Sequence, residues 1–171
     1  FLGFLSDESC GKCNPCREGI RQMLKILTNI TNGLGKEGDI ELLQELAENA
    51  KGTSLCALGK TAPNPVLSTL NHFRSEYESH INEGRCPALS CKQLIAFYID
   101  PDKCKACGAC VKKSAPVAIE GGKKLIHVID QDKCTKCGSC LETCPTDFGA
   151  VSKTSGKPIP SAISEEARKI G

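Results

Sequence analysis

Cysteine spacing constrains this chain more than any other feature of its sequence. The pattern Cys-x-x-Cys-x-x-Cys occurs three times, at residues 10–16, 104–110 and 134–140. Three thiols placed so closely in one tight loop suit a metal centre better than a ladder of disulfides. The spacing therefore predicts three thiol-lined loops, each built to hold metal.

The composition supports metal binding in a reducing compartment. The 171 residues include 13 Cys, an odd number, but only five Phe, two Tyr and no Trp, so bound metal is expected to help stabilise a core poor in aromatics. No secretory signal opens the chain, and we expect a cytoplasmic protein with reduced thiols. The net charge of +2 gives no case for a nucleic-acid partner. No apolar run approaches the roughly 18 residues of a membrane span, so membrane insertion is not expected.

Residues 1–81 read as a helical region. Apolar residues recur at three- and four-residue spacing after the first cysteine run, which predicts an amphipathic helix. This stripe consists of Ile20, Met23, Leu24, Leu27 and Ile30. Asp39 is the expected N-cap of a second helix that ends before Gly52, and Asn64 followed by Pro65 predicts the start of a third. The expected buried side of that third helix consists of Val66, Leu70, Phe73 and Tyr77.

An internal repeat follows a connector at residues 82–93. Residues 98–116 match residues 128–146 at an offset of 30, and a strand-like run precedes each cysteine loop, at 94–100 and 125–130. We place the repeat domain at residues 94–151. Residues 152–171 form a tail that begins as a Ser/Gly/Pro linker and ends in a short expected helix from Ser164.

The second copy of the repeat carries an extended motif. Cys144 and Pro145 complete it as Cys-x2-Cys-x2-Cys-x3-Cys-Pro, which resembles the bacterial two-cluster ferredoxins. The resemblance implies a small α+β domain with two four-iron, four-sulfur (4Fe–4S) clusters, in which Gly108 and Gly138 relieve crowding where each loop turns. Zinc is the rival metal, but zinc does not require three cysteines at this even spacing twice over.

Position 114 breaks the pattern. In two-cluster ferredoxins the fourth cysteine of each run ligates the other cluster, so the resemblance assigns Cys144 to the cluster of the first copy. That cluster would be held by Cys104, Cys107, Cys110 and Cys144. The other cluster would be held by Cys134, Cys137, Cys140 and, at the position of a fourth cysteine, Ser114.

Four outcomes remain open for this second cluster: a Ser-ligated cube, a cube with water or hydroxide on one iron, a three-iron (3Fe–4S) cluster or an empty site. We favour a cube with a weak or absent fourth protein ligand. A further alternative takes the missing thiolate from Cys91.

Residues 1–80 carry a second resemblance. The segment "ESCGKCNPCREG" and the later "SLCALGKTAPNPV" supply four thiols for one 4Fe–4S cluster, unless Cys56 is only a small buried hydrophobic residue. These four are Cys10, Cys13, Cys16 and Cys56. Both segments resemble the cluster-binding C-terminal domain of the flavin-containing, NADH-oxidising subunit of respiratory complex I, which also occurs in NAD-linked hydrogenases and formate dehydrogenases. The resemblance implies a helical bundle whose cluster lies beside FMN.

The order of the two regions extends the resemblance. A helical cluster domain followed by a ferredoxin extension resembles the beta subunit of electron-bifurcating, NAD-dependent hydrogenases. We therefore expect a mainly α helical-bundle domain followed by a small α+β two-cluster ferredoxin domain. The chain begins with Phe, and the FMN- and NADH-binding loops of that family match nothing in it, so we expect those sites upstream, in a longer polypeptide.

The expected function is electron transfer within a larger oxidoreductase. The chain would relay electrons between an FMN/NAD(H) site and hydrogenase or ferredoxin partners, inside a multisubunit complex, without a substrate site of its own. Two alternatives remain: the equivalent subunit of an NAD-linked formate dehydrogenase, and a structural iron–sulfur scaffold.

The connector holds a weaker metal pattern. His80, Cys86 and Cys91 form a loosely spaced set, which we interpret as a structural zinc site at the hinge, as the resemblance to bifurcating hydrogenases also implies. The alternative is two reduced, inert thiols and a surface histidine. His72 is a poor fourth ligand, because eight residues along a helix separate it from His80 by about 12 Å. The fourth donor would come from elsewhere in the full subunit or from a partner.

Overall fold

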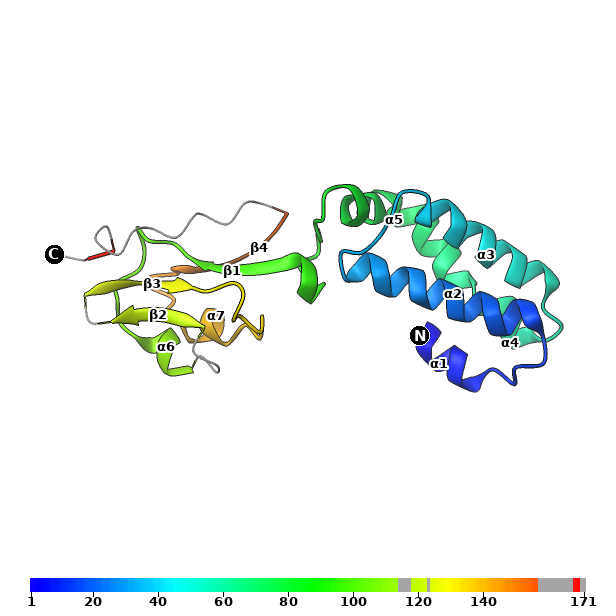
Figure 1. Ribbon diagram of the computed structural model, residues 1–171, viewed down its shortest axis with the longest axis horizontal. Coiled ribbons are helices and arrows are strands. Elements are labelled where there is room, and N and C mark those ends of the chain that lie inside the picture. The colour runs from blue at the N-terminus through cyan, green and yellow to red at the C-terminus, as the bar shows by residue number, and fades with distance from the viewer. Residues whose placement is uncertain (114–117, 123, 157–167, 170–171) are drawn as a thin grey trace. The chain divides into compact units, whose positions relative to one another are not determined.

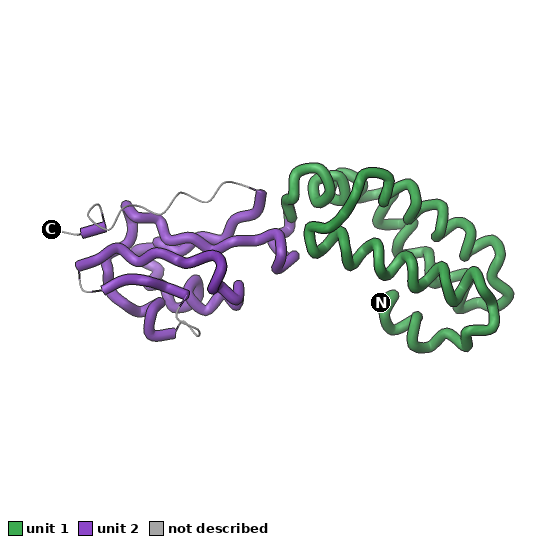
Figure 2. The backbone as a smooth tube through the Cα atoms, in the orientation of Figure 1, with its two compact units in different colours: residues 1–87 green, residues 88–171 purple. Residues whose placement is uncertain are grey.

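A computed structural model describes residues 1–113, 118–122, 124–156 and 168–169 of the chain. The chain divides into two compact units, residues 1–87 and 88–171, which Figure 2 colours separately. The division falls inside the predicted connector, 82–93. Each unit has its own hydrophobic core.

The first unit is built from helices (Figure 1). They are α1 (Leu2–Glu8), α2 (Asn14–Thr31), α3 (Asp39–Thr53), α4 (Ala57–Thr61) and α5 (Asn64–Asn82). Helices α2, α3 and α5 pack on one another, and the short helices α1 and α4 pack against this group. The three long helices were predicted. The two short ones are below the length at which hydrophobic periodicity can be recognised.

The core of the first unit follows the predicted stripes. From α2, Ile20, Met23 and Ile30 are buried, while Leu24 and Leu27 are partly buried against them. Burying such apolar side chains contributes about 1.5–3 kcal/mol each, so this contact surface is what stabilises the helices. The fully buried or nearly buried partners on α3 are Ile40, Leu43, Ala47 and Ala50.

Three local predictions in this unit were wrong. Asp39 is the first residue of α3 rather than its N-cap, because Gly38 takes the left-handed conformation at the cap position. The Asp39 carboxylate instead accepts a hydrogen bond from the Lys36 backbone N–H at 2.9 Å. Helix α3 continues through Gly52 to Thr53. Phe73 was expected inside but is 53% exposed, because its backbone leaves the helical region there and kinks α5.

The second unit mixes short strands and helices (Figure 1). Its elements are a 3-10 turn η1 (Lys92–Leu94), β1 (Ile95–Ile99), α6 (Ala109–Lys113), β2 (Ile119–Gly122), β3 (Leu125–Ile129), α7 (Ser139–Thr143) and β4 (Val151–Ser155). Strand β1 pairs antiparallel with β4, and β2 pairs antiparallel with β3. Each pair therefore takes one strand from each copy of the repeat. Strands β1 and β3 confirm the two strand-like runs.

Strand β4 lies mostly in the segment assigned to the tail, residues 152–171. Residues 152–155 pair with β1, and the Ser155 hydroxyl donates a hydrogen bond to the Leu94 carbonyl at 2.6 Å. Farther along, Arg168 and Lys169 return to strand β3. The expected helix from Ser164 falls largely outside the described residues.

The two copies fold alike in detail. The carboxylates of Asp100 and Asp130 each accept the backbone N–H two residues on, at 3.1 and 3.0 Å. Each also pairs with the lysine three residues on, Lys103 at 3.3 Å and Lys133 at 2.8 Å. The same turn chemistry therefore starts both cysteine loops. The buried core under these loops consists of Ile95, Phe97, Cys110, Ile119, Ile129, Cys140 and Val151.

Among the helices that the structure describes, none combines the length and the apolarity needed to cross a membrane.

Candidate iron–sulfur and metal sites

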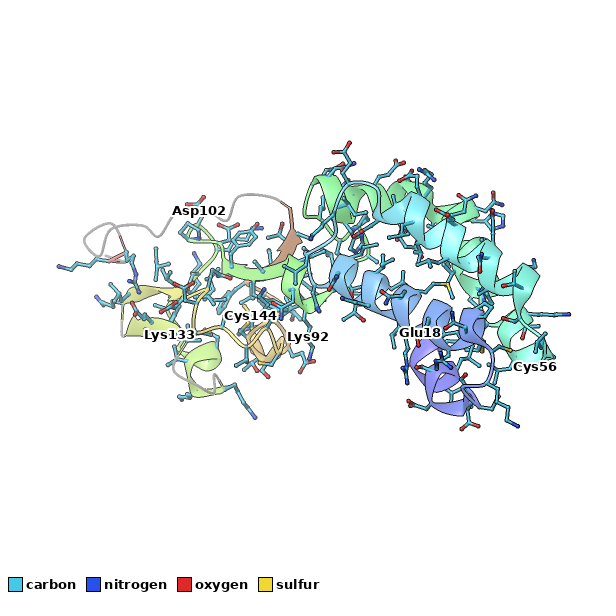
Figure 3. All side chains as sticks on the ribbon, turned by 45° about the vertical axis from the view of Figure 1, so that its right-hand side comes forward. Glu18, Cys56, Lys92, Asp102, Lys133 and Cys144 are labelled. Carbon is cyan, nitrogen blue, oxygen red and sulfur yellow. The ribbon has the colours of Figure 1, made fainter. Side chains whose placement is uncertain are left out.

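One cavity of the second unit is lined by four cysteines. These are Cys104, Cys107, Cys110 and Cys144. Cys104 and Cys107 come from the loop between β1 and α6, and Cys110 lies in the first turn of α6. Cys144 lies just after α7 in the other copy, where Figure 3 labels it. Apolar side chains, among them Ile99 and Val151, complete the lining. The arrangement is a set of soft donors inside a mostly apolar wall, which fits an iron–sulfur cluster.

The backbone of both cysteine loops turns through the left-handed region. Gly108 and Gly138 have φ of +74° and +84°, as their expected role in the turn requires. Two residues earlier, Ala106 and Lys136 also have positive φ, at 52° and 56°. Such repeated left-handed residues turn successive N–H groups toward one side of a loop, a conformation that stabilises negative charge.

Burial makes the deepest thiols hard to ionise in the absence of metal. Burial, with the nearby Cys104 sulfur as the next cause, raises the pKa of Cys110 to about 11. Burial likewise raises the pKa of Cys140, its counterpart in the other copy. A buried thiolate needs compensating positive charge, which metal supplies as it displaces the proton.

A second cavity takes its cysteines from the other loop alone. Cys134, Cys137 and Cys140 line it, beside Phe97 and Ile129. The Ser139 hydroxyl oxygen lies 3.4 Å from the Cys137 sulfur, and the hydrogen bond between these two side chains is the main cause that lowers the pKa of Cys137. Ser114, the expected fourth ligand, lies outside the described residues. Cys91, the alternative donor, is not among the described residues that line this cavity.

In the first unit two segments far apart in sequence meet at the cysteines. The Leu55 backbone N–H points at the Cys13 sulfur at 3.5 Å, and the Ser9 hydroxyl lies 3.5 Å from the Cys16 sulfur. Gly59 makes the approach possible, since a Cβ there would lie 2.5 Å from the Ser54 hydroxyl and 3.0 Å from the Cys16 Cβ. The loop of residues 10–16 and the turn into α4 therefore form one site.

Helix starts position two of these thiols. Cys13 is the N-cap of α2 and Cys56 is the N-cap of α4, where Figure 3 labels it. Hydrogen bonds from the backbone N–H groups of Gly59 and Leu58 lower the pKa of Cys56. Cys56 is exposed, so the alternative that it is a small buried hydrophobic residue is wrong. Cys10 is exposed as well, whereas Cys16 is buried against the helices.

The connector set is divided between the two units. His80 and Cys86 lie in the first unit, and Cys91 lies in the second. The His80 Nδ1 lies 2.7 Å from the Glu76 carbonyl oxygen, which places a proton on Nδ1 and a lone pair on Nε2. A backbone carbonyl holding the second ring nitrogen is the usual support of a metal-binding histidine. His72 is not part of this group; its ring packs edge-on against Phe73.

Sequence reasoning missed His127. This histidine lies in β3, is 2% exposed, and its Nδ1 is 3.6 Å from the Cys104 sulfur. Burial first and the Arg168 guanidinium second lower its pKa, so the ring is neutral near pH 7. A signal was available: position 127 is buried in the run "LIHVID", where the first copy has Phe97 at the same offset.

Comparison with known protein families separates the two halves of the chain. Residues 1–80 match the NADH-ubiquinone oxidoreductase-F iron-sulfur binding region. Residues 97–113 and 127–148 match the 4Fe-4S binding domain. The second match covers both cysteine loops of the repeat.

Several curated proteins are similar to the chain. The NADP-reducing hydrogenase subunit HndC of Solidesulfovibrio fructosivorans is 46% identical over 127 residues, which are 74% of this chain and 26% of that protein. The F subunit of the NADH-quinone oxidoreductase of Streptomyces coelicolor is 46% identical over 84 residues, 49% of this chain and 19% of that protein. The chain thus spans about a quarter or less of the length of these relatives.

Among solved structures, an NAD+-reducing NiFe hydrogenase in its H2-reduced state aligns with 47% of this chain and 14% of its own, at 35% identity and a TM-score of 0.45. The matches to the two iron–sulfur families and to these curated proteins confirm the resemblance drawn from the cysteine segments.

Proposed function

We propose that this chain is the C-terminal, electron-transferring part of the NADH-oxidising flavoprotein subunit of a hydrogenase-type complex. Its order of modules, an NADH-ubiquinone oxidoreductase-type iron–sulfur region followed by a 4Fe-4S domain, supports this assignment. So does its 46% identity to the NADP-reducing hydrogenase subunit across 127 residues, a length greater than that of either module alone. The FMN and NAD(H) sites would lie upstream of this chain.

We assign three clusters to three sets of cysteines. The first set is Cys10, Cys13, Cys16 and Cys56; the second is Cys104, Cys107, Cys110 and Cys144; the third is Cys134, Cys137 and Cys140 with Ser114 or an exogenous ligand. The observation that carries the proposal is the position of Cys144. It lines the same cavity as the three cysteines of the first copy, as cross-ligation in a two-cluster ferredoxin requires.

Each cluster, when bound, supplies reversible one-electron transfer. The chain's own residues hold and tune it. The cysteine thiolates would bind the irons. The left-handed turns at Gly108 and Gly138 would direct backbone N–H groups toward the cluster sulfurs, and side chains such as Ile99 and Ile129 would exclude water from the cavities. Relay to hydrogenase subunits or to a ferredoxin, and flavin-based bifurcation upstream, are the roles we propose for such a module.

We further propose that His80, Cys86 and Cys91 bind a structural zinc ion. The sequence spacing of the three residues and the backbone carbonyl next to the His80 Nδ1 support it. Cys86 is 1% exposed, which suits a closed structural site rather than a catalytic one. We also propose a cytoplasmic location, because cysteine runs with metal-ligand spacing are typical of reducing compartments.

Anaerobic reconstitution followed by a redox titration tests the proposal. Three clusters would give about twelve irons per chain, or about eleven if the third is a three-iron cluster. We expect reversible EPR signals at potentials between the NADH and ferredoxin couples. Clusters that assemble but stay redox-silent in that range would favour the scaffold alternative instead. Absence of iron uptake would exclude both.

A matched pair of variants separates iron from zinc. Cys144→Ser should lower the iron content and weaken the signal of one cluster, while leaving zinc unchanged. Cys86→Ser should remove zinc and leave the iron content unchanged. Loss of iron in both variants would contradict the assignment of two kinds of site.

A further inference from the structure

The contact between His127 and Cys104 is the starting observation. The His127 Nδ1 lies 3.6 Å from the Cys104 sulfur, within reach of an N–H···S hydrogen bond, since sulfur is larger than oxygen. Both side chains are buried, so water does not compete for either atom. The two residues are 23 positions apart and come from different copies of the repeat, β3 and the loop after β1.

The chemistry of a ligated sulfur fixes the direction of this bond. A metal-bound cysteine is a thiolate, which has no proton and can only accept. The imidazole nitrogen that faces the Cys104 sulfur must then carry the hydrogen. In His127 that nitrogen is Nδ1, so Nδ1 is the donor and Nε2 carries no hydrogen in the neutral ring. A buried histidine without any partner would be unfavourable, so the contact also accounts for a polar ring in this core.

The ring is fixed in place by its neighbours. A Cβ at Gly121 would lie 2.1 Å from the His127 Cδ2, so only glycine on β2 leaves room for the ring. On the same hairpin, Arg168 donates hydrogen bonds to the carbonyl oxygens of Ile126 and Glu120, at 3.0 and 3.1 Å. These contacts hold the backbone just before His127 and the paired strand β2, and so help keep Nδ1 directed at the sulfur.

The repeat supplies an internal comparison. An offset of 30 residues places Phe97 at the position equivalent to His127. Phe97 is buried and lines the cavity of Cys134, Cys137 and Cys140, but its ring carries no hydrogen-bond donor. The two cavities are thus built on the same scaffold, and only one of them directs a side-chain N–H at its cysteines from this position.

We propose that His127 donates a hydrogen bond through Nδ1–H to the Cys104 thiolate and thereby raises the reduction potential of the cluster held by the first copy. Reduction adds negative charge that spreads over the sulfurs, and a donor at a sulfur stabilises the reduced state more than the oxidised one. Phe97 gives the other cluster no such increase. His127 is therefore a positioning and tuning residue that makes two similar clusters unequal. This inference rests on the proposed function, since it requires clusters in both cavities.

Two variants of nearly equal shape test it in the full chain. Asparagine can place an amide N–H near the position of the histidine Nδ1, and leucine has almost the same shape without a donor. EPR-monitored titration of the reconstituted protein should find the potential of this cluster close to wild type in His127→Asn. In His127→Leu the equilibrium constant for reduction should fall about tenfold, which is a shift of about 59 mV to more negative potential for one electron.

The cluster of Cys134, Cys137 and Cys140 provides the control. Its potential should be unchanged in both variants, and Phe97→Leu should leave the potential of the Cys104 cluster unchanged. Equal potentials in the asparagine and leucine variants would overturn the inference, and so would equal loss of the cluster from both, because shape rather than hydrogen bonding would then be decisive. Failure of the wild-type chain to take up iron would instead overturn the proposed function.

Discussion

At the scale of single residues, the candidate sites depend on glycines that make room for a cysteine or its neighbour. Gly59 brings the turn into α4 against Cys16, where a Cβ would overlap the Ser54 side chain. Ser54 is buried, so its side chain has little room to move aside for an added methyl group. Its hydroxyl has no hydrogen-bond partner among the described residues. We therefore expect the cluster of Cys10, Cys13, Cys16 and Cys56 to be sensitive to substitution of Gly59.

Gly59→Ala is therefore predicted to destabilise the first unit by about 1–3 kcal/mol, the usual range for overpacking. It should also lower the iron content by as much as one cluster. Thermal unfolding and iron analysis check both effects. Gly52→Ala is the matched control: it lies in α3 with nothing within 4 Å of an added Cβ, and it should be neutral or stabilising by up to about 1 kcal/mol. Equal loss in the two variants would contradict the steric argument.

Ser114→Cys tests the position that breaks the repeat. If position 114 supplies the fourth ligand of the second-copy cluster, a thiolate there should complete a four-iron cube. The EPR spectrum of that cluster should then change, any three-iron signal should disappear, and the iron content of the site should be four. An unchanged spectrum and unchanged iron content would show that position 114 is not a ligand.

The residue-level chemistry was largely predictable because cysteine spacing is local information. The sequence alone predicted all the cysteines that line the two cavities of the second unit. It did not predict His127 as a partner of Cys104, because that contact depends on which face of β3 meets the loop after β1. Gly59 was missed for the same reason. Only a glycine fits at this position because Ser54 and Cys16 approach it from other segments of the chain.

At the scale of secondary-structure elements, the long helices were predictable and the interruptions in them were not. The apolar stripe of α5 is regular, and it predicted Phe73 on the buried side. The structure has a backbone kink at that residue, with φ −131° and ψ 29°, and the ring is half exposed. No proline or glycine lies at the kink, so the sequence carries no signal that would have predicted it.

The kink separates two positions that sequence treats alike. Leu70→Ala should cost about 2–5 kcal/mol, because Leu70 is 5% exposed in the core. Phe73→Ala should cost less than about 1 kcal/mol despite the larger side chain, since half of it already meets solvent. Chemical denaturation of both variants checks the order. A larger loss from Phe73→Ala would contradict the observed exposure.

Strand β4 was missed because its sequence, "VSKTS", is mostly polar. Its pairing with β1 comes from the repeat as a whole rather than from its own composition. Ending the chain after Ala150 should therefore unfold the second unit, whereas ending it after Gly156 should leave both strand pairs. Circular dichroism and iron content distinguish the two. Equal stability of the truncated chains would mean that β4 contributes nothing.

At the scale of the whole molecule, the division into two compact units predicts two separable sets of iron–sulfur clusters. Each unit has its own hydrophobic core and its own cysteines. Residues 1–87 alone should fold with about four irons, and residues 88–171 alone with about seven or eight. Iron analysis and EPR of the separate pieces check this. Loss of clusters from a folded piece would show that ligands are shared between the units.

The strand pairing of the second unit has a consequence for its synthesis. The hairpin of β2 and β3 is local and can form within about 1–10 μs, whereas Ile95 pairs with Ser155 and closes a loop of roughly 60 residues. On the ribosome, β1 emerges long before its partner and remains an open edge, to which other chains can add. The thiols of Cys104, Cys107 and Cys110 likewise lack their fourth partner until Cys144 has been synthesised. Assembly of the first-copy cluster must therefore wait until residue 144 has been synthesised, and a ribosome stalled before that residue leaves an edge strand and an incomplete set of three ligands exposed together.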